Sequence, residues 1–150
     1  MSDERGFTLL EMMLVIVLLS IMMSLVIGRS PFNDDRSVDR LFNALEFAAG
    51  QAANEQRPYG LQFQNKSWQL LRLSRHQHQL VWLPIGHRLA KGTLADDVQI
   101  ELQTPAAVGN GYPSIVFWPD EIAPFSLWLQ QGDRRQVIQP VKGQLQREER

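Results

Sequence analysis

The residues from Phe7 to Ile27 form an apolar run whose only charge is the carboxylate of Glu11. As an α-helix, this run would extend roughly 31 Å, about one hydrocarbon thickness of a bilayer. A carboxylate in such a helix costs roughly 2–3 kcal/mol where it faces lipid near the bilayer centre. No Lys, Arg or His lies among residues 7–27. We therefore expect a transmembrane helix over residues 7–28 in which Glu11 pairs with a cation from outside the run.

Two ordinary explanations of this run compete with that expectation. A secretory signal peptide has a core of about 7–15 apolar residues and a small-residue cleavage site, whereas residues 12–27 carry no charge and no Ala-x-Ala precedes Arg29. A plain single-pass anchor stays open, but it gives no reason for Glu11. Arg5 favours a cytoplasmic amino terminus, although Arg29 and Arg36 flank the other end.

The segment Gly6-Phe7-Thr8-Leu9-Leu10-Glu11, followed by an apolar helix, resembles the class III signal of type IV pilins and type II secretion pseudopilins. The resemblance implies that residues 1–6 are a leader, that a prepilin peptidase cuts between Gly6 and Phe7, and that Phe7 is then N-methylated. It also implies that Glu11 contacts the amino terminus of an adjacent subunit during filament assembly. The leader departs from the family pattern because it contains Asp3 and Glu4 where leaders are usually more basic.

Length and composition restrict the rest of the chain. About 120 residues remain after the anchor, which is enough for one modest domain. The formal net charge of −1 argues against broad electrostatic binding to nucleic acid. No cysteine is present, so disulfides, thiolate catalysis and zinc–thiolate sites are excluded. Within the pilin-like family, this absence counts against the major type IV pilins whose carboxy-terminal loop is closed by a disulfide.

Residues 29–56 are predicted to form a linker and an amphipathic helix. Pro31 disfavours helical geometry at the residue before it, so we expect a break over residues 28–33. Asp34, Asp35 and Ser37 are candidate caps. The helix should end near Gln56, before Arg57-Pro58. Its apolar stripe is predicted to comprise Val38, Leu41, Phe42, Leu45, Ala49, Ala52 and Ala53.

Residues 57–150 are predicted to form a periplasmic antiparallel β domain. Apolar and polar residues alternate in short runs separated by Gly, Pro and Asp turns, which favours antiparallel pairing. The fold class is therefore α+β: a long amino-terminal helix, transmembrane and then amphipathic, packed on an antiparallel sheet or two sheets. Residues 74–79 and 143–150 are predicted to be a polar connection and a frayed end. The predicted strands are 59–64, 68–73, 80–83, 98–102, 115–118, 125–129 and 136–139.

The β domain also resembles that of the H-type minor pseudopilins of type II secretion. The resemblance is carried by residues 59–63 (Tyr-Gly-Leu-Gln-Phe), residues 68–70 (Trp-Gln-Leu) and residues 115–125 (Ile-Val-Phe-Trp-Pro-Asp-Glu-Ile-Ala-Pro-Phe). Members of that family tend to have an Ile-x-Phe strand, a Pro-Asp-Gly type of turn and a Pro-Phe that opens the next strand. This chain has Glu121 where glycine is common.

The chemistry-bearing side chains give no catalytic constellation, and we expect no enzyme, metal or cofactor. His76, His78 and His87 have a metal-binding alternative, but their polar surroundings favour solvated hairpin residues. The adjacent acids Asp96-Asp97 and Asp120-Glu121 diverge rather than converge, which favours turns. The tryptophans Trp68, Trp82, Trp118 and Trp128 are predicted to pack in the sheet, although an exposed one would suit an interface.

What the resemblance implies for function is a minor pseudopilin in the inner membrane. Its carboxy-terminal domain would be periplasmic, and its partners would be other minor pseudopilins, the major pseudopilin and the prepilin peptidase/methyltransferase, with no nucleic acid. The alternative is a minor type IV pilin in pilus assembly, adhesion or DNA uptake, motivated by Arg134, Arg135, Lys142 and Arg147. An anchored periplasmic enzyme is a third class, but no group of residues supports it.

Overall fold

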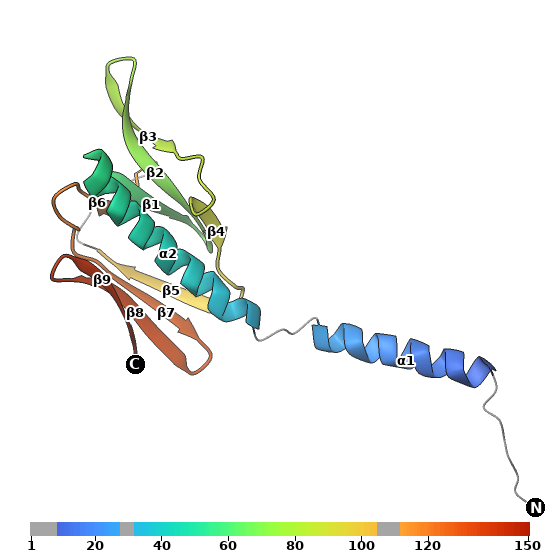
Figure 1. Cartoon of the computed structure of the whole chain (residues 1–150). Helices are drawn as coiled ribbons and strands as arrows, with labels where there is room; N and C mark the ends of the chain where they lie inside the picture. The colour runs from blue at the N-terminus through green and yellow to red at the C-terminus, as the bar shows by residue number, and fades with distance from the viewer. Residues whose placement is uncertain (1–8, 28–31, 105–111) are drawn as a thin grey trace, which may run out of the picture. The chain divides into compact units, whose positions relative to one another are not determined.

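A computed structural model describes residues 9–27, 32–104 and 112–150, which fall into two compact units, Met1–Asn33 and Asp34–Arg150 (Figure 1). The first unit contains helix α1, Leu9–Ile27, in which 19 residues form one continuous apolar element. In the part of the chain that the structure describes, no helix combines the length and apolarity needed to cross a membrane. The leader and the junction Gly6-Phe7 lie outside the described residues.

Helix α2, Phe32–Glu55, is the amphipathic helix expected from the sequence. It begins at Phe32, so the last two residues of the predicted break over residues 28–33 are helical; residues 28–31 lie outside the description. The buried stripe confirms Val38, Leu41, Leu45 and Ala52 and adds Ala44 and Ala48. Ala53 is exposed, so its assignment to the stripe was wrong; it lies one position beyond the buried Ala52, about 100° around the helix.

The carboxy-terminal end of α2 lies where the sequence placed it. Gln56 has a left-handed backbone with φ of 53°, a common way to end a helix. Its side-chain Nε2 donates to the carbonyl of Ala53 at 2.7 Å, which satisfies one of the last helical carbonyls. The chain then passes Arg57-Pro58 and enters the first strand.

The first sheet has five strands in the order β3-β2-β1-β6, with β4 also paired to β2. All of its pairings are antiparallel. The short strand β6 lies at an edge, as its flanking prolines predicted, whereas β4 was not predicted. Residues 74–79 are not a loop: β2 and β3 extend into them and leave a two-residue turn. The strands are β1 (Tyr59–Gln64), β2 (Ser67–His76), β3 (Gln79–Pro84), β4 (Lys91–Thr93) and β6 (Ile115–Phe117).

The second sheet has four antiparallel strands in the order β5-β7-β8-β9. The predicted frayed end at residues 143–150 is wrong, because Gln144–Glu149 forms β9 along β8. A tight turn at Lys142 and Gly143, with φ of 51° and 79°, permits this hairpin. The strands are β5 (Val98–Gln103), β7 (Ser126–Gln131), β8 (Arg134–Val141) and β9 (Gln144–Glu149).

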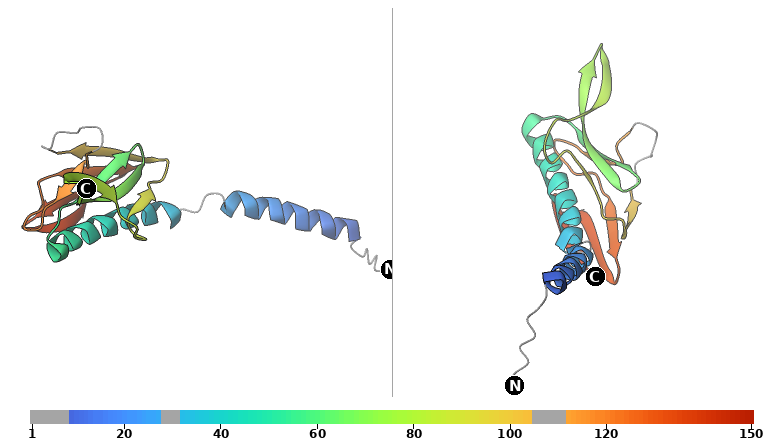
Figure 2. Two further views of the ribbon diagram at one scale, coloured as in Figure 1. Left: turned by 90° about the horizontal axis from the view of Figure 1, so that it is seen from above. Right: turned by 90° about the vertical axis from the view of Figure 1, so that its right-hand side faces the viewer.

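Helix α2 and the two sheets share one hydrophobic core. In Figures 1 and 2, α2 runs along the same side of both sheets. The largest fully buried side chains come from α2, from the first sheet and from the second, as Leu41, Phe117 and Ile138 illustrate. Phe125 meets Phe117 edge to face, with ring centroids 6.3 Å apart. The α+β class with an antiparallel two-sheet domain is therefore confirmed.

Candidate functional site

The amino-terminal helix carries the predicted assembly residue in its first turn. Glu11 is the third residue of α1, where the partial positive charge of a helix amino terminus favours a carboxylate. Its position at the beginning of the helix also brings it close in sequence to the predicted new amino terminus at Phe7. Gly6 and Phe7 themselves lie outside the described residues, so cleavage, methylation and the contact with Glu11 stay predictions.

The surface of α1 is apolar on every side. From Leu9 to Ile21 the large hydrophobic side chains are between 43% and 81% exposed, and they occupy all faces of the helix. A helix that is hydrophobic all round is stable only when other apolar groups cover it. Taken by itself, α1 therefore has apolar surface on every face that other groups would need to cover.

The three histidines do not come together as a metal site. Among the described residues, no group of three or more His, Cys, Asp or Glu is placed to hold a metal ion. His76 closes the β2–β3 hairpin opposite Gln79, and His78 lies in the turn. His87 stacks on Phe47 with ring centroids 4.3 Å apart, and its Nδ1 accepts from the Leu89 N–H at 3.1 Å.

The two acidic pairs lie in loops, as the sequence indicated. Asp97 precedes β5, and its Oδ2 accepts from Gln131 Nε2 at 3.0 Å. Asp120 and Glu121 follow β6, where the Glu121 carbonyl accepts from the Trp118 N–H at 3.0 Å and closes the turn. The turn therefore forms with glutamate in place of the common glycine. These contacts are structural and give no acid–base pair.

The tryptophans differ in burial. Trp68 is 2% exposed and belongs to the core, and Trp82 and Trp128 are half-buried. Trp118 is 45% exposed, so the prediction that it packs in the sheet was wrong. Phe117 takes the inward position of β6, and the alternation of a strand turns the next residue outward.

Two of the basic residues that motivated DNA uptake, Arg135 and Arg147, contact other side chains of the second unit. The Arg135 guanidinium lies 4.4 Å from the centre of the Trp128 ring. Arg147 forms an ion pair with Asp39 of α2 and lies over the Phe42 ring. Lys142 occupies the exposed turn between β8 and β9. The ion pair of Arg147 thus links β9 to α2, and Arg135 contacts the ring of Trp128 in the neighbouring strand β7.

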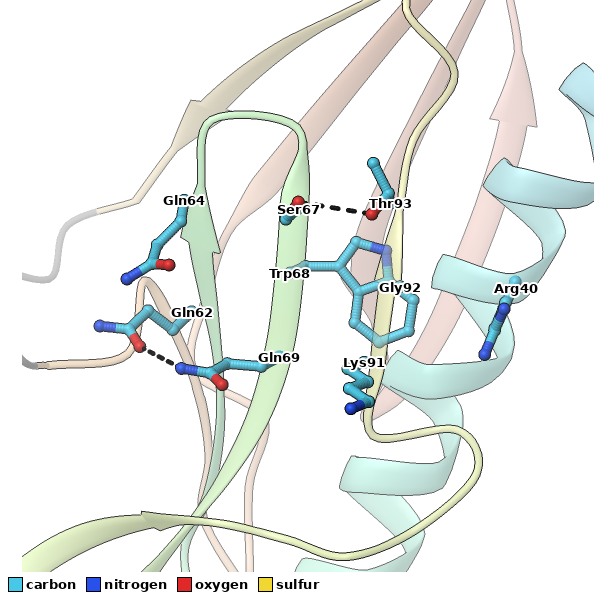
Figure 3. Close-up of a pocket in the computed structure, with 9 residues that line it drawn as sticks. All are labelled: Arg40, Gln62, Gln64, Ser67, Trp68, Gln69, Lys91, Gly92 and Thr93. Atoms are coloured by element: carbon cyan, nitrogen blue, oxygen red, sulfur yellow. Dashed lines mark hydrogen bonds between the residues drawn. The ribbon is translucent and has the colours of Figure 1, made fainter.

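A groove of about 550 Å³ lies beside β4 and is lined by polar side chains and Trp68 (Figure 3). The Trp68 indole covers Gly92, and its buried Nε1 has no hydrogen-bond partner. Gln69 donates to Gln62 at 2.9 Å, and Figure 3 shows these glutamines on the opposite side of β2 from Trp68 and Arg40. The polar groups thus do not converge on one ligand position.

The comparisons with known proteins agree with this arrangement. The prokaryotic N-terminal methylation motif matches residues 1–27. Over 139 residues the chain is 32% identical to type II secretion system protein H of Escherichia coli (strain K12), covering 86% of this chain and 82% of that protein. The chain belongs to the type II secretion system protein H family. The family member of Dickeya chrysanthemi is 30% identical over 156 residues, covering 87% of this chain and 86% of its own length.

Solved structures of pseudopilins have the same fold. The minor pseudopilin EpsH from the type 2 secretion system of Vibrio cholerae superposes with a TM-score of 0.59 at 15% identity, covering 75% of this chain and 93% of EpsH. The solution structure of E. coli GspH superposes with a TM-score of 0.58 at 21% identity, covering 81% of this chain and 93% of GspH. The solved structures thus share the fold, and the sequence relatives confirm the predicted resemblance to the H-type family.

Sequence reasoning missed one feature of possible functional weight, the long β2–β3 hairpin. The polar run at residues 74–79 was interpreted as a loop because it lacks apolar alternation. The turn residues Gln77 and His78 include no Gly, Asn or Asp, the residue types that usually mark a tight two-residue hairpin, so the sequence carried no clear signal for it. Both residues have positive φ, 46° and 67°, as a type I′ turn requires.

Proposed function

We propose that the chain is a minor pseudopilin that acts as a structural subunit near the tip of a short periplasmic pseudopilus. This filament would help export folded proteins across the outer membrane. The observation that carries the proposal is the alignment to a type II secretion protein H over more than four-fifths of both chains. The pilin-like fold and the methylation motif at residues 1–27 support it.

In this proposal, residues 1–6 are removed and the apolar residues 7–28 anchor the chain in the inner membrane. The fully apolar surface of α1 supports this because lipid and neighbouring helices would both cover it. The amino terminus would be cytoplasmic before cleavage, and residues 57–150 would form the periplasmic domain. Its partners would be other minor pseudopilins, the major pseudopilin and the prepilin peptidase/methyltransferase.

The register of assembly would come from an ion pair. Cleavage after Gly6 creates an ammonium group at Phe7, four residues before Glu11. In a low-dielectric environment this cation offsets the cost of the carboxylate. Pairing between the Phe7 ammonium of one subunit and Glu11 of its neighbour would then set how far successive helices are offset.

The test uses the full chain expressed in a strain that lacks its own copy. Glu11→Ala should lose assembly with the other pseudopilins, measured by co-purification after cross-linking, and should reduce protein secretion into the medium. Glu46→Ala removes an exposed carboxylate from α2 and serves as the matched control. Mass spectrometry should find a mature chain that begins with N-methylated Phe7. Normal assembly of the Glu11→Ala variant would exclude the register mechanism, and a functional chain that keeps Met1 would exclude processing.

A further inference from the structure

The β2–β3 hairpin extends beyond the rest of its sheet. Strand β1 pairs with β2 only as far as Arg72, and the Leu73 N–H still donates to the Pro58 carbonyl, so residues 74–76 of β2 pair with β3 alone. Figure 1 and the right view of Figure 2 show the hairpin projecting past the carboxy-terminal end of α2. The projecting part is therefore two-stranded, and in the part of the chain that the structure describes the edge of β3 that faces away from β2 is open along the whole strand.

The outward edge of β3 has hydrogen-bonding groups available. The Ile85 N–H donates to the Leu70 carbonyl at 3.3 Å, which places residues 70 and 85 in a hydrogen-bonded pair. Because such pairs alternate in an antiparallel ladder, Val81 and Leu83 bond to β2, while the N–H and C=O groups of Leu80 and Trp82 point away from it. Among the described residues, no strand pairs with this edge.

The same edge is apolar, which is unusual for an unpaired strand. Leu80 is 65% exposed and Leu83 is 42% exposed, and Val81 and Trp82 between them are only half-buried. Proteins normally protect an open edge with charged side chains, bulges or prolines. Residues 80–83 contain none of these, and Pro84 comes only at the end of the strand.

The charged residues in the segment that contains this edge are all basic, although Glu55 of α2 pairs with Arg72 at 3.6 Å near the base of the hairpin. From Gln56 to Ala95, which includes β1–β4, the sequence contains no Asp or Glu. Arg75 lies directly opposite Leu80 in the hairpin, so the two side chains are on the same face. A partner that lies along β3 would therefore meet positive charge beside apolar surface. The basic residues of the segment are Arg57, Lys66, Arg72, Arg75, Arg88 and Lys91, together with His76, His78 and His87.

We propose that the outer edge of β3 binds an extended acidic segment of a partner protein as an additional strand. Backbone groups of Leu80 and Trp82 would pair with it, the apolar side chains would be covered, and Arg75 would attract its carboxylates. The hairpin tip and the first residues of α2 lie at opposite ends of the second unit (Figure 2). A lipid surface offers no row of backbone N–H and C=O groups that could pair with the open edge of β3, which favours a protein over lipid head groups.

The experiment uses the full chain in zwitterionic detergent micelles, labelled with 15N. The probe is a synthetic octapeptide in which Glu and Val alternate, added to millimolar concentration. We expect the backbone amide signals of Leu80 and Trp82 to shift in a saturable way. Two control peptides separate charge attraction from backbone pairing. One replaces every Glu by Lys, and the other keeps the side chains but carries a methyl group on every backbone nitrogen. Neither should produce saturable shifts at these amides.

Variants of the chain also test charge attraction and backbone pairing separately. Arg75→Glu should weaken peptide binding roughly fivefold or more, in line with the loss and reversal of an exposed charge contact. Arg36→Glu makes the same charge change at the opposite end of the second unit and should leave binding unchanged. Leu80→Pro removes an outward N–H that the hairpin does not use, and should abolish the shift of the Trp82 amide, whereas Leu80→Ala should only weaken binding.

Three results would overturn the proposal. The first is the absence of saturable binding of the Glu–Val peptide. The second is equal binding of the N-methylated peptide, which would mean charge attraction without strand pairing. The third is a stronger response of the Leu80 and Trp82 amides to phosphatidylglycerol vesicles or to a DNA duplex, each of which would assign the hairpin to a different class of partner.

Discussion

Replacing Leu45 by alanine tests whether α2 is held to the sheets by its buried stripe. Leu45 is fully buried in the core shared by α2 and both sheets. Leu80 provides a matched control because the same substitution there removes the same atoms from a side chain that is 65% exposed. The difference between the two variants therefore isolates the contribution of burial.

The expected magnitude follows from the burial of each side chain. Fully burying a leucine stabilises by about 1.5–3 kcal/mol, and the cavity left by truncation raises the cost of Leu→Ala in a core to about 2–5 kcal/mol. We expect about 3 kcal/mol for Leu45→Ala. Leu80 keeps only about a third of its surface covered, so Leu80→Ala should cost less than about 1 kcal/mol.

The assay is urea unfolding of the Asp34–Arg150 fragment, the compact second unit, followed by the fluorescence of its tryptophans. For a domain of this size the Leu45→Ala variant should also melt roughly 12 °C lower than the parent. Equal losses of stability in the two variants would refute the reasoning, because the core position would then contribute no more than the surface position. Leu45→Asp should prevent stable folding, since it buries an unpaired charge.

Two further predictions concern packing and pH. Gly92→Ala should destabilise the fragment by about 1–3 kcal/mol in urea unfolding, because a Cβ at this position would lie 2.6 Å from Trp68 Cζ2. The control Gly50→Ala, which places a Cβ in open space within α2, should instead stabilise the fragment by up to about 1 kcal/mol. Equal effects of the two substitutions would contradict the close contact at Gly92. Burial, followed by a hydrogen bond to Glu55, raises the pKa of Tyr59. The neutral Tyr59 side chain therefore contributes fully to the free energy of unfolding below pH about 10, and this contribution is lost as the pH rises further. The difference in unfolding free energy between the parent and Tyr59→Phe should narrow above that pH, and a constant difference would contradict the shift.

Helix α2 was predictable from the sequence because its evidence is local. The spacing of Val38, Leu41 and Leu45 repeats with the period of a helix, and Arg57-Pro58 marks where it must end. Ala44 and Ala48 were missed although they lie three residues after Leu41 and Leu45 and therefore on the same face of the helix. Their complete burial depends on how closely the sheets approach α2, which the spacing alone does not give.

The strands that escaped prediction depend on pairing rather than on their own composition. Strand β9 contains one apolar residue, Leu145, among polar and charged ones, so no alternation marks it. It forms because a tight turn folds it onto β8 and because Arg147 reaches Asp39 of α2. Strand β4 has only three residues and exists through its pairing with β2.

The candidate functional residues also divide into those that a local sequence pattern predicts and those whose exposure depends on strand pairing. Gly6, Phe7 and Glu11 are predicted from the sequence alone, because the proposed processing and pairing would need particular residues at particular offsets. The open edge of β3 could not be found in this way, since the exposure of Leu80 depends on which strands lie beside it. Residues 80–83 resemble any short buried strand in composition, and only the topology shows that this one has a free side.

The two exposed apolar features of the chain differ in what can cover them. Helix α1 is apolar on all faces and has no backbone groups to offer, because a helix satisfies its own N–H and C=O groups. Lipid or other apolar helices therefore suit it, and in the proposed mechanism the carboxylate of Glu11 would fix the register of those helices. Strand β3 is apolar and also presents unpaired backbone groups, which lipid cannot satisfy. An edge of this kind requires a partner that supplies its own backbone, so the two surfaces should engage different molecules and should be separable by mutation.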